Sequence, residues 1–222
     1  MNLNCRRSAF ASTLLFAATI MLPPAAAVAD RGALTLEAGG FGSMSSLPPS
    51  VGTGSRVTGT SLGGILGLRY APTGWLELSV GGFYEAPASY FHAGTVVSND
   101  NGDFAGTLEV RVSSWGMTAG ARYVHGLVWR YFLGLEAGFA RQTAEQLDLI
   151  DVTDPANPRS FGLGLADQTT TALLLVPVAG LEWVASDHVT VGLSSRLQVH
   201  LGERSTVELL VPLTLGYSWY VL

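Results

Sequence analysis

The stretch His188-Val-Thr-Val-Gly-Leu-Ser-Ser-Arg-Leu-Gln-Val-His-Leu201 alternates between apolar and polar residues over most of its length. The apolar residues share one parity: Val189, Val191, Leu193, Leu197, Val199 and Leu201. Small or polar residues occupy the other parity: His188, Thr190, Gly192, Ser194, Arg196, Gln198 and His200. A period of two predicts a β-strand with two unlike faces. At roughly 3.3 Å per residue, a tilted strand of this length can cross a bilayer.

The first residues of the chain have the layout of a cleaved secretory signal. Arg6 and Arg7 precede an apolar run from Ala9 to Leu22, which is followed by the small-residue site Ala27-Val28-Ala29. We therefore expect residues 1–29 to be removed as a signal peptide and residues 30–222 to form one domain. The sole cysteine, Cys5, lies in this signal, so neither a disulfide nor a thiolate metal site is expected in the mature chain.

The composition of the chain favours a membrane barrel. Charged residues make up 13% of the chain, about half the share found in ordinary soluble domains, and there are 27 glycines. Removing residues 1–29 leaves 10 basic residues, all Arg, against 17 acidic ones, a net charge of −7, which argues against a nucleic-acid partner. The mature chain contains no apolar stretch of about 20 residues, so a membrane helix is not expected. An exported, apolar, Gly-rich chain of this kind indicates a transmembrane β-barrel.

Eight strand-like runs can be placed along the mature chain. They are about Ala33 to Gly42, Val57 to Tyr70, Trp75 to Glu85, Gly106 to Tyr123, Val128 to Gln142, Thr170 to Trp183, His188 to Leu201 and Ser205 to Leu222. The connections alternate between long and tight, except for a short last one, Gly202-Glu203-Arg204. Short periplasmic turns and longer external loops are typical of outer-membrane barrels. The pattern predicts an all-β, eight-stranded, antiparallel up-and-down transmembrane barrel.

The polar parity of these runs indicates which face lies inside. A soluble lipocalin-like barrel would bury the apolar parity and expose the polar one. A soluble exterior would carry many more charges than the small, sparsely charged polar parity seen here, so we expect that parity to line a narrow lumen. Aromatic residues of the apolar parity form two expected girdles, Tyr70, Tyr123, Trp129, Tyr131, Trp183 and Trp219 beside the tight turns and Tyr84, Trp115 and Phe139 toward the long loops.

Three places depart from this pattern. In the fourth run, Leu108, Val110 and Val112 have the opposite parity to the lipid-facing residues that follow them. We expect a phase slip near Ser113-Ser114, caused by a bulge or by the strand leaving the membrane. Pro177 and Pro212 lie inside the sixth and eighth runs, where a closed barrel has no edge for them, and local bulges are expected there.

The end of the chain carries a recognisable motif. In Gly216-Tyr217-Ser218-Trp219-Tyr220-Val221-Leu222, the residues Gly216, Trp219 and Val221 stand at the offsets of a barrel-assembly signal, while Leu222 replaces the common final Phe. Together with its eight strands, the chain resembles the small outer-membrane barrels of Gram-negative bacteria, the family of the OmpA transmembrane domain and OmpX. The resemblance implies export through the periplasm, with periplasmic chaperones and the barrel assembly machinery as partners. It also implies contact with outer-membrane lipid and lipopolysaccharide.

Charged residues of the inward parity form a candidate ion-pair network. The set is balanced, with Glu37, Glu77, Glu136 and Glu182 against Arg69, Arg122, Arg130 and Arg196. Because an eight-stranded barrel is only just wide enough for side chains to fill, each charge needs a partner or water. We expect a plug of Arg–Glu pairs that fixes the register and blocks the lumen. Resemblance to OmpA makes a small switchable pore the alternative, although bulky inward residues at Ile65, Phe132 and Tyr220 argue against a wet path.

Other candidate sites carry weaker signals. His188 and His200 share the inward parity but lie too far apart along one strand to bind one metal. His200 near Ser205 invites comparison with lipid A deacylases, yet their His-x-Ser pair faces lipid, and no such set can be assembled here. The carboxylates Asp148, Asp151 and Asp154 could bind a cation, but an acidic loop is usually only solvated.

The expected function is an outer-membrane protein with a structural or surface-interaction role and no enzymatic activity. No cofactor is implied. Tyr90, Phe91 and His92, beside an acidic turn, would suit surface adhesion to a ligand that the sequence does not identify. The alternatives are a narrow channel for ions or small solutes and a lipid-modifying hydrolase.

Overall fold

The computed structural model describes residues 31–47, 57–99, 102–151, 159–162, 167–202 and 206–220. Its strands are β1 (Ala33–Leu47), β2 (Val57–Tyr70), β3 (Leu76–Asn99), β4 (Gly102–His125), β5 (Trp129–Asp151), β6 (Arg159–Gly162), β7 (Gln168–Val184), β8 (Val189–Leu201) and β9 (Thr206–Tyr220). The expected signal peptide, residues 1–29, lies outside the described residues. No helix in the described residues is long and apolar enough to cross a membrane.

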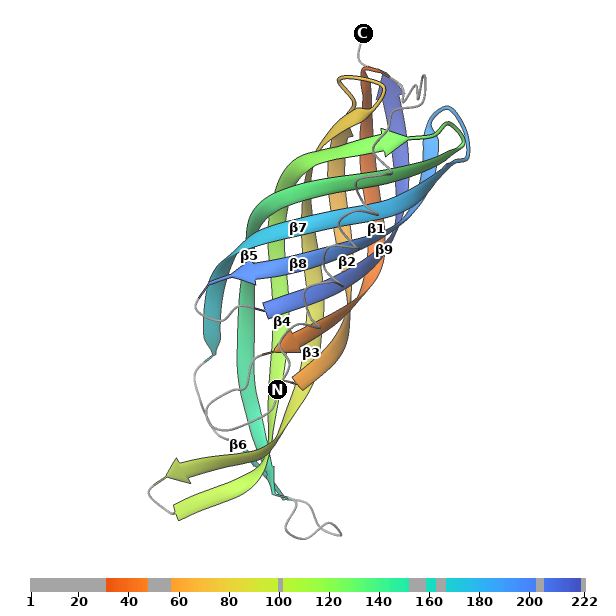
Figure 1. Ribbon diagram of the computed structural model, residues 1–222. Coiled ribbons are helices and arrows are strands. Elements are labelled where there is room, and N and C mark those ends of the chain that lie inside the picture. Colours follow the sequence, from red (N-terminus) through yellow and green to blue (C-terminus); the bar gives the residue numbers. More distant parts are fainter. Residues whose placement is uncertain are drawn as a thin grey trace, which may run out of the picture.

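Eight of these strands close into a barrel (Figure 1). Each pairs antiparallel with its neighbours around the barrel, and β9 returns to β1 with Ala33 opposite Tyr220. The remaining strand, β6, pairs with β5 through Asp148–Asp151 and adds to an extension beyond the barrel. The predicted eight-stranded up-and-down barrel is therefore confirmed.

The burial of β8 confirms the assignment of its two faces. Leu193 is 54% exposed on the outer surface, whereas Gln198 is fully buried in the lumen. The same division holds around the barrel, where an outer belt of exposed apolar side chains includes Leu36, Leu66, Leu78, Val80, Leu133, Leu135, Leu175, Leu181, Val211, Leu213 and Leu215. Exposed aromatic rings border this belt, among them Tyr70, Trp75, Tyr84, Trp115, Trp129, Trp183, Tyr217 and Trp219.

The third to fifth strands are much longer than predicted. The segment from Ala86 to Ala105 is mostly a continuation of the β3–β4 hairpin, whose ladder runs out to Asn99 opposite Gly102. Figure 1 shows these strands running past the end of the barrel. The prediction of a long loop was wrong because β3 and β4 stay paired beyond the point where outward apolar residues alternate with inward polar ones. We call the end with this extension the outer end, and the end with the tight turns the inner end.

Of the two causes predicted for the phase slip near Ser113-Ser114, a bulge in β4 is wrong. Leu108, Val110, Val112 and Ser114 are all buried, so the parity of β4 continues unbroken through this point. The irregularity lies instead in the neighbouring strand, where the pairing of β3 shifts between Glu85 and Ala88, with further shifts toward the tip and on the β5 side at Glu109/Val110. What changes along β4 is the content of the interior, which turns from polar to apolar as Leu108, Val110 and Val112 pack with Tyr90.

The two prolines do not produce the predicted bulges. The β7–β8 ladder has the same register before and after Pro177, with Leu175 opposite Val199 and Val178 opposite Arg196. The register on both sides of Pro212 in β9 is likewise unchanged. Both ladders skip two residue pairs beside β8, as expected where a residue lacks an N–H donor, but no extra residue is inserted. The barrel thus tolerates each proline by losing local pairing with β8.

Candidate functional site

The inner end of the lumen is filled by a cluster of charged side chains from five strands. We call this the inner cluster: Glu37 of β1, Arg69 of β2, Glu77 of β3, Arg122 of β4 and Glu182 of β7. Arg69 Nε lies 3.0 Å from Glu37 Oε2, and its Nη1 lies 3.2 Å from Glu77 Oε2 and 2.5 Å from Glu182 Oε1. Since β2 and β7 are not neighbours, the last contact crosses the lumen. Arg69 therefore holds three carboxylates from three different strands.

Arg122 supplies the second centre of the inner cluster. Its Nε and Nη2 both approach Glu77 Oε2, at 2.7 and 2.6 Å, and Nη2 also lies 2.9 Å from Glu182 Oε1. The guanidinium carbon of Arg122 sits 4.3 Å from the centre of the Phe132 ring, a cation–π geometry. Each of the two arginines thus contacts both Glu77 and Glu182, which makes the inner cluster a network rather than a set of separate pairs.

Glycines leave the space that these side chains occupy. A Cβ at Gly67 would lie 2.9 Å from Glu37 Oε1. A Cβ at Gly216 would lie 2.5 Å from Thr190 Oγ1 and 3.3 Å from Arg69 Nη2. The glycines of the inward parity are therefore the counterpart of the long charged side chains, because a barrel this narrow has no room for a side chain at every inward position.

A second ion pair lies deeper in the lumen. Arg196 of β8 donates to Glu136 of β5, and Thr118 Oγ1 donates to the same carboxylate at 2.6 Å. Ser79 Oγ donates to the other carboxylate oxygen at 3.2 Å.

Arg130, the remaining predicted member of the ion-pair network, is buried near the tight turn, where its Nε donates to the Leu127 carbonyl at 3.3 Å. In the β5–β7 ladder, Arg130 stands directly opposite Glu182.

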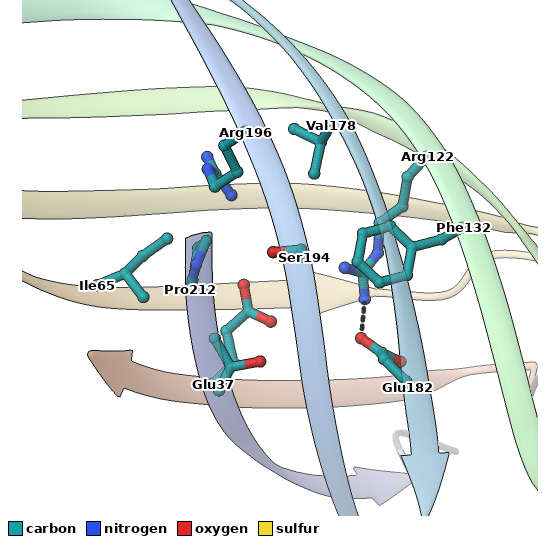
Figure 2. A pocket seen from close by; sticks show the side chains of 10 residues that line it. Glu37, Ile65, Arg122, Phe132, Val178, Glu182, Ser194, Arg196 and Pro212 are labelled. Atoms are coloured by element: carbon teal, nitrogen blue, oxygen red, sulfur yellow. Dashed lines mark hydrogen bonds and ion pairs between the residues drawn. The ribbon is translucent and has the colours of Figure 1, made fainter. Parts of the chain in front are cut away.

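A small cavity separates the inner cluster from the Arg196–Glu136 pair. Its lining includes Glu37, Ile65, Arg122, Phe132, Glu182 and Arg196, and it has room for about one water molecule. Figure 2 shows Arg122 joined to Glu182 on one side of this cavity and Ile65 on the other. Ile65 and Phe132 are buried inside the barrel, as their parity predicts, whereas Tyr220 is 44% exposed at the end of β9.

Sequence reasoning missed two inward carboxyl groups near the outer end. The described interior buries six glutamates and four arginines, because Glu85 and Glu208 add to the four glutamates and four arginines that were predicted. We define the outer cluster as Ser43, Ser61, Glu85, Ser114, Gln198, His200 and Glu208. Glu85 has the inward parity of Glu77, and Glu208 that of Thr214, so the alternation pattern could have identified both. They were missed because Glu85 ends the predicted third strand and Glu208 lies in a mainly apolar run.

The other predicted residues are dispersed. His188 is exposed at a turn, where its ring stacks on Tyr217, so its predicted inward position is wrong. Tyr90 and His92 are buried, and only Phe91 of the three predicted adhesive side chains is exposed. Gly216 and Trp219 lie in β9, while Val221 and Leu222 lie outside the described residues.

The predicted carboxylates of the third long connection remain untested. Asp148 and Asp151 lie on β5, but their side chains, and all of Asp154, fall outside what the structure describes. Within the described residues, no group of three or more His, Cys, Asp or Glu side chains could hold a metal ion.

A closed antiparallel barrel of eight strands, packed with charged side chains and surrounded by exposed apolar residues, has the fold of the small outer-membrane β-barrels. No protein-family model and no curated protein matches the chain significantly. Among solved structures, the outer membrane protein OprG from Pseudomonas aeruginosa is 14% identical and has a TM-score of 0.53, with 86% of this chain and 97% of OprG covered. Neisserial surface protein A is 15% identical, with a TM-score of 0.50 and coverages of 86% and 100%. At these identities the likeness shows the shared fold alone.

Proposed function

We propose that this chain is an integral outer-membrane barrel without enzymatic activity, with a structural or surface-interaction role. The observation that carries the proposal is the inner cluster, in which Arg69 and Arg122 bind Glu77 and Glu182 across the lumen. Such a network ties together strands that are not neighbours in the sheet. It is suited to holding a barrel rigid and closed rather than to passing solutes.

The membrane placement rests on the outer surface of the barrel. Leu66 is 59% exposed, Leu213 59% and Leu215 60%, on strands that carry few charges on that face. An apolar surface of this extent on a soluble protein would drive aggregation, whereas the lipid chains of a bilayer cover it. The aromatic rings that border the belt are suited to the two interfaces of the bilayer. Outer-membrane lipid, lipopolysaccharide and the assembly machinery are the partners that this placement implies.

The energetics of buried charges support the proposal of a closed lumen. Separating a buried ion pair leaves each partner without compensation, at a cost of several kcal/mol. Opening a path past the inner cluster would separate more than one such contact at once, because Arg69 and Arg122 share their carboxylates. Ile65 and Phe132 narrow the same region with apolar side chains. Recognition would therefore be confined to the extension formed by β3, β4, β5 and β6 and to the connections at the outer end.

Planar-bilayer recording of the refolded chain tests the closed lumen. The proposal expects no stepwise conductance at voltages that do not break the bilayer, and Arg69→Ala serves as the matched variant in which a leak is expected. Regular conductance steps from the wild-type chain would instead support a narrow channel. Mass spectrometry of lipid A from cells with and without the gene tests the hydrolase alternative, since any change in acylation would overturn the absence of enzymatic activity.

A further inference from the structure

The outer cluster differs from the rest of the lumen in its charge. Glu37, Glu77 and Glu182 contact Arg69 or Arg122, and Glu136 contacts Arg196. Glu85 and Glu208 have no arginine contact among the described residues, and the only cationic candidate beside them is His200, whose Nε2 lies 3.7 Å from Glu208 Oε2. Two carboxyl groups are therefore buried together, at 6% and 3% exposure, without a fixed positive charge.

The hydrogen bonds of Glu85 are those of an ionised carboxylate. Ser43 Oγ donates to its Oε1 at 2.5 Å, Ser61 Oγ approaches the same oxygen, and Ser114 Oγ donates to Oε2 at 2.6 Å. Hydroxyl donors on both oxygens favour the charged form of a carboxyl group. We therefore assign Glu85 as the ionised, accepting carboxylate of the Glu85–Glu208 pair.

The surroundings of Glu208 are incomplete by contrast. Its carboxyl group lies against that of Glu85, and among the described residues its Oε1 has no hydrogen-bond partner. Two carboxylates buried against each other repel unless one of them carries a proton, which then forms a hydrogen bond to the other, or a cation lies between them. Gln198 stands directly opposite Glu208 in the β8–β9 ladder and is fully buried, and neither of its amide atoms has a hydrogen-bond partner among the described residues. An amide oxygen and a carboxylate oxygen thus both lack partners beside the pair.

The described groups around Glu85 and Glu208 include no fixed positive charge, so a proton or a cation has to compensate one of the two carboxylates. His200 on β8 and Tyr90 on β3 are the titratable neighbours, whereas β1, β2 and β4 present the hydroxyls of Ser43, Ser61 and Ser114. The nearest arginine on β8, Arg196, is held by Glu136. A multivalent metal does not suit this set, because the described residues hold no cluster of three metal-binding side chains.

We propose that Glu85 and Glu208 form a buried binding site for one monovalent cation, either a proton shared between the carboxyl groups or an alkali ion in its place. Glu85 remains ionised on its serine donors, and the ligand sits on the Glu208 side, next to the Gln198 amide. Removing the ligand leaves two like charges in contact in a site with little water. The outer end of the barrel is therefore stable only while the site is filled.

Two measurements on the refolded chain in detergent test the site. Infrared spectra in H₂O and D₂O should show the carbonyl stretch of a protonated carboxyl group in the wild type and its loss in Glu208→Gln. Thermal unfolding should show wild-type stability falling as the pH rises through the release of the shared proton, whereas Glu208→Gln stays flat. Glu109→Gln, at a half-exposed carboxylate that accepts from Ser89, is the control and should follow the wild type.

The choice of salt distinguishes a shared proton from a bound alkali ion. If an alkali ion fills the site, NaCl should stabilise the wild type over choline chloride at equal ionic strength, and Glu208→Gln should lose this difference. Wild-type stability that instead falls as the pH is lowered, with no protonated carboxyl signal and no preference for sodium, would overturn the proposal. The infrared titration of the wild type stands by itself should Glu208→Gln fail to refold.

Discussion

The two ends of the lumen solve the problem of buried charge in different ways. In the inner cluster, two arginines bridge three glutamates, so each charge has an oppositely charged partner at 3.2 Å or less. In the outer cluster, carboxyl groups face hydroxyls, an amide and a histidine. Six of the ten buried side-chain N and O atoms without a hydrogen-bond partner in the described residues belong to Gln198, His200, Thr206 and Glu208.

This difference separates a region built for rigidity from one that needs a ligand. A network in which every charge has an oppositely charged partner resists rearrangement, because any other arrangement leaves a buried charge unpaired. A cluster of carboxyl groups without such partners must be completed by water, a proton or an ion. We therefore expect substitutions in the inner cluster to destabilise the protein under all conditions, and substitutions in the outer cluster to have effects that depend on pH or salt.

The largest effect is expected from Arg69→Ala. The substitution leaves Glu37, Glu77 and Glu182 without their common partner, in a site where Arg69 itself is 4% exposed. Loss of one member of a buried network costs about 3 to 5 kcal/mol in the free energy of unfolding. Urea titration of the refolded chain, followed by tryptophan fluorescence, measures it. Arg141→Ala, at an exposed arginine on the outer face of β5, is the control, and an equal loss in both variants would contradict the buried role of Arg69.

Arg122→Ala and Glu182→Ala should each cost about 3 kcal/mol, because in both cases a buried charge loses one partner and keeps another. The double variant should lose less than the sum of the two, since it removes both members of a contact measured at 2.9 Å. Heat-modifiable gel mobility and urea titration give the three free energies. Negligible losses in both single variants would mean that these side chains face water, and full additivity would mean that they do not interact.

Gln198→Met tests the outer cluster, where buried polar atoms lack hydrogen-bond partners. If water or the proposed ligand completes the amide, replacing it with a thioether of similar length removes hydrogen bonds worth about 1 to 2 kcal/mol. The loss should be larger when the site is filled, at low pH for a shared proton or in NaCl rather than choline chloride for an alkali ion. A gain in stability at every pH would show that the amide has no partner, because removing an unpaired buried polar group is favourable.

Much of the fold could be predicted from the sequence because alternation reports directly on the two faces of a strand. The parity of Leu193 and Gln198 predicted which side chain is exposed and which is buried, and the sparse charge of the polar parity predicted the lumen. The ends of β3, β4 and β5 could not be predicted in this way. Beyond Tyr84 and Trp115 the apolar residues turn inward, so pairing continues after the membrane pattern has ended.

The charged residues of the lumen were predictable by type but not by partner. Parity placed Arg69 and Glu182 inside, yet they lie 113 residues apart on strands that are not neighbours. Their contact depends on how far each strand is staggered around the barrel, and the period of two carries no information about that stagger. The outer cluster needed the same knowledge, because Glu85 comes from β3 and Glu208 from β9.

Leu193→Ala should have the smallest effect and serves as the reference for the lumen variants. The side chain is 54% exposed on the outer face, so truncation removes apolar contact with lipid or detergent but opens no cavity in a packed interior. A loss of about 1 kcal/mol is expected from the apolar area removed. Urea titration in the detergent used for Arg69→Ala provides the comparison. A loss as large as that of Arg69→Ala would mean that Leu193 packs inside a protein core, and the assignment of the two faces would have to be reversed.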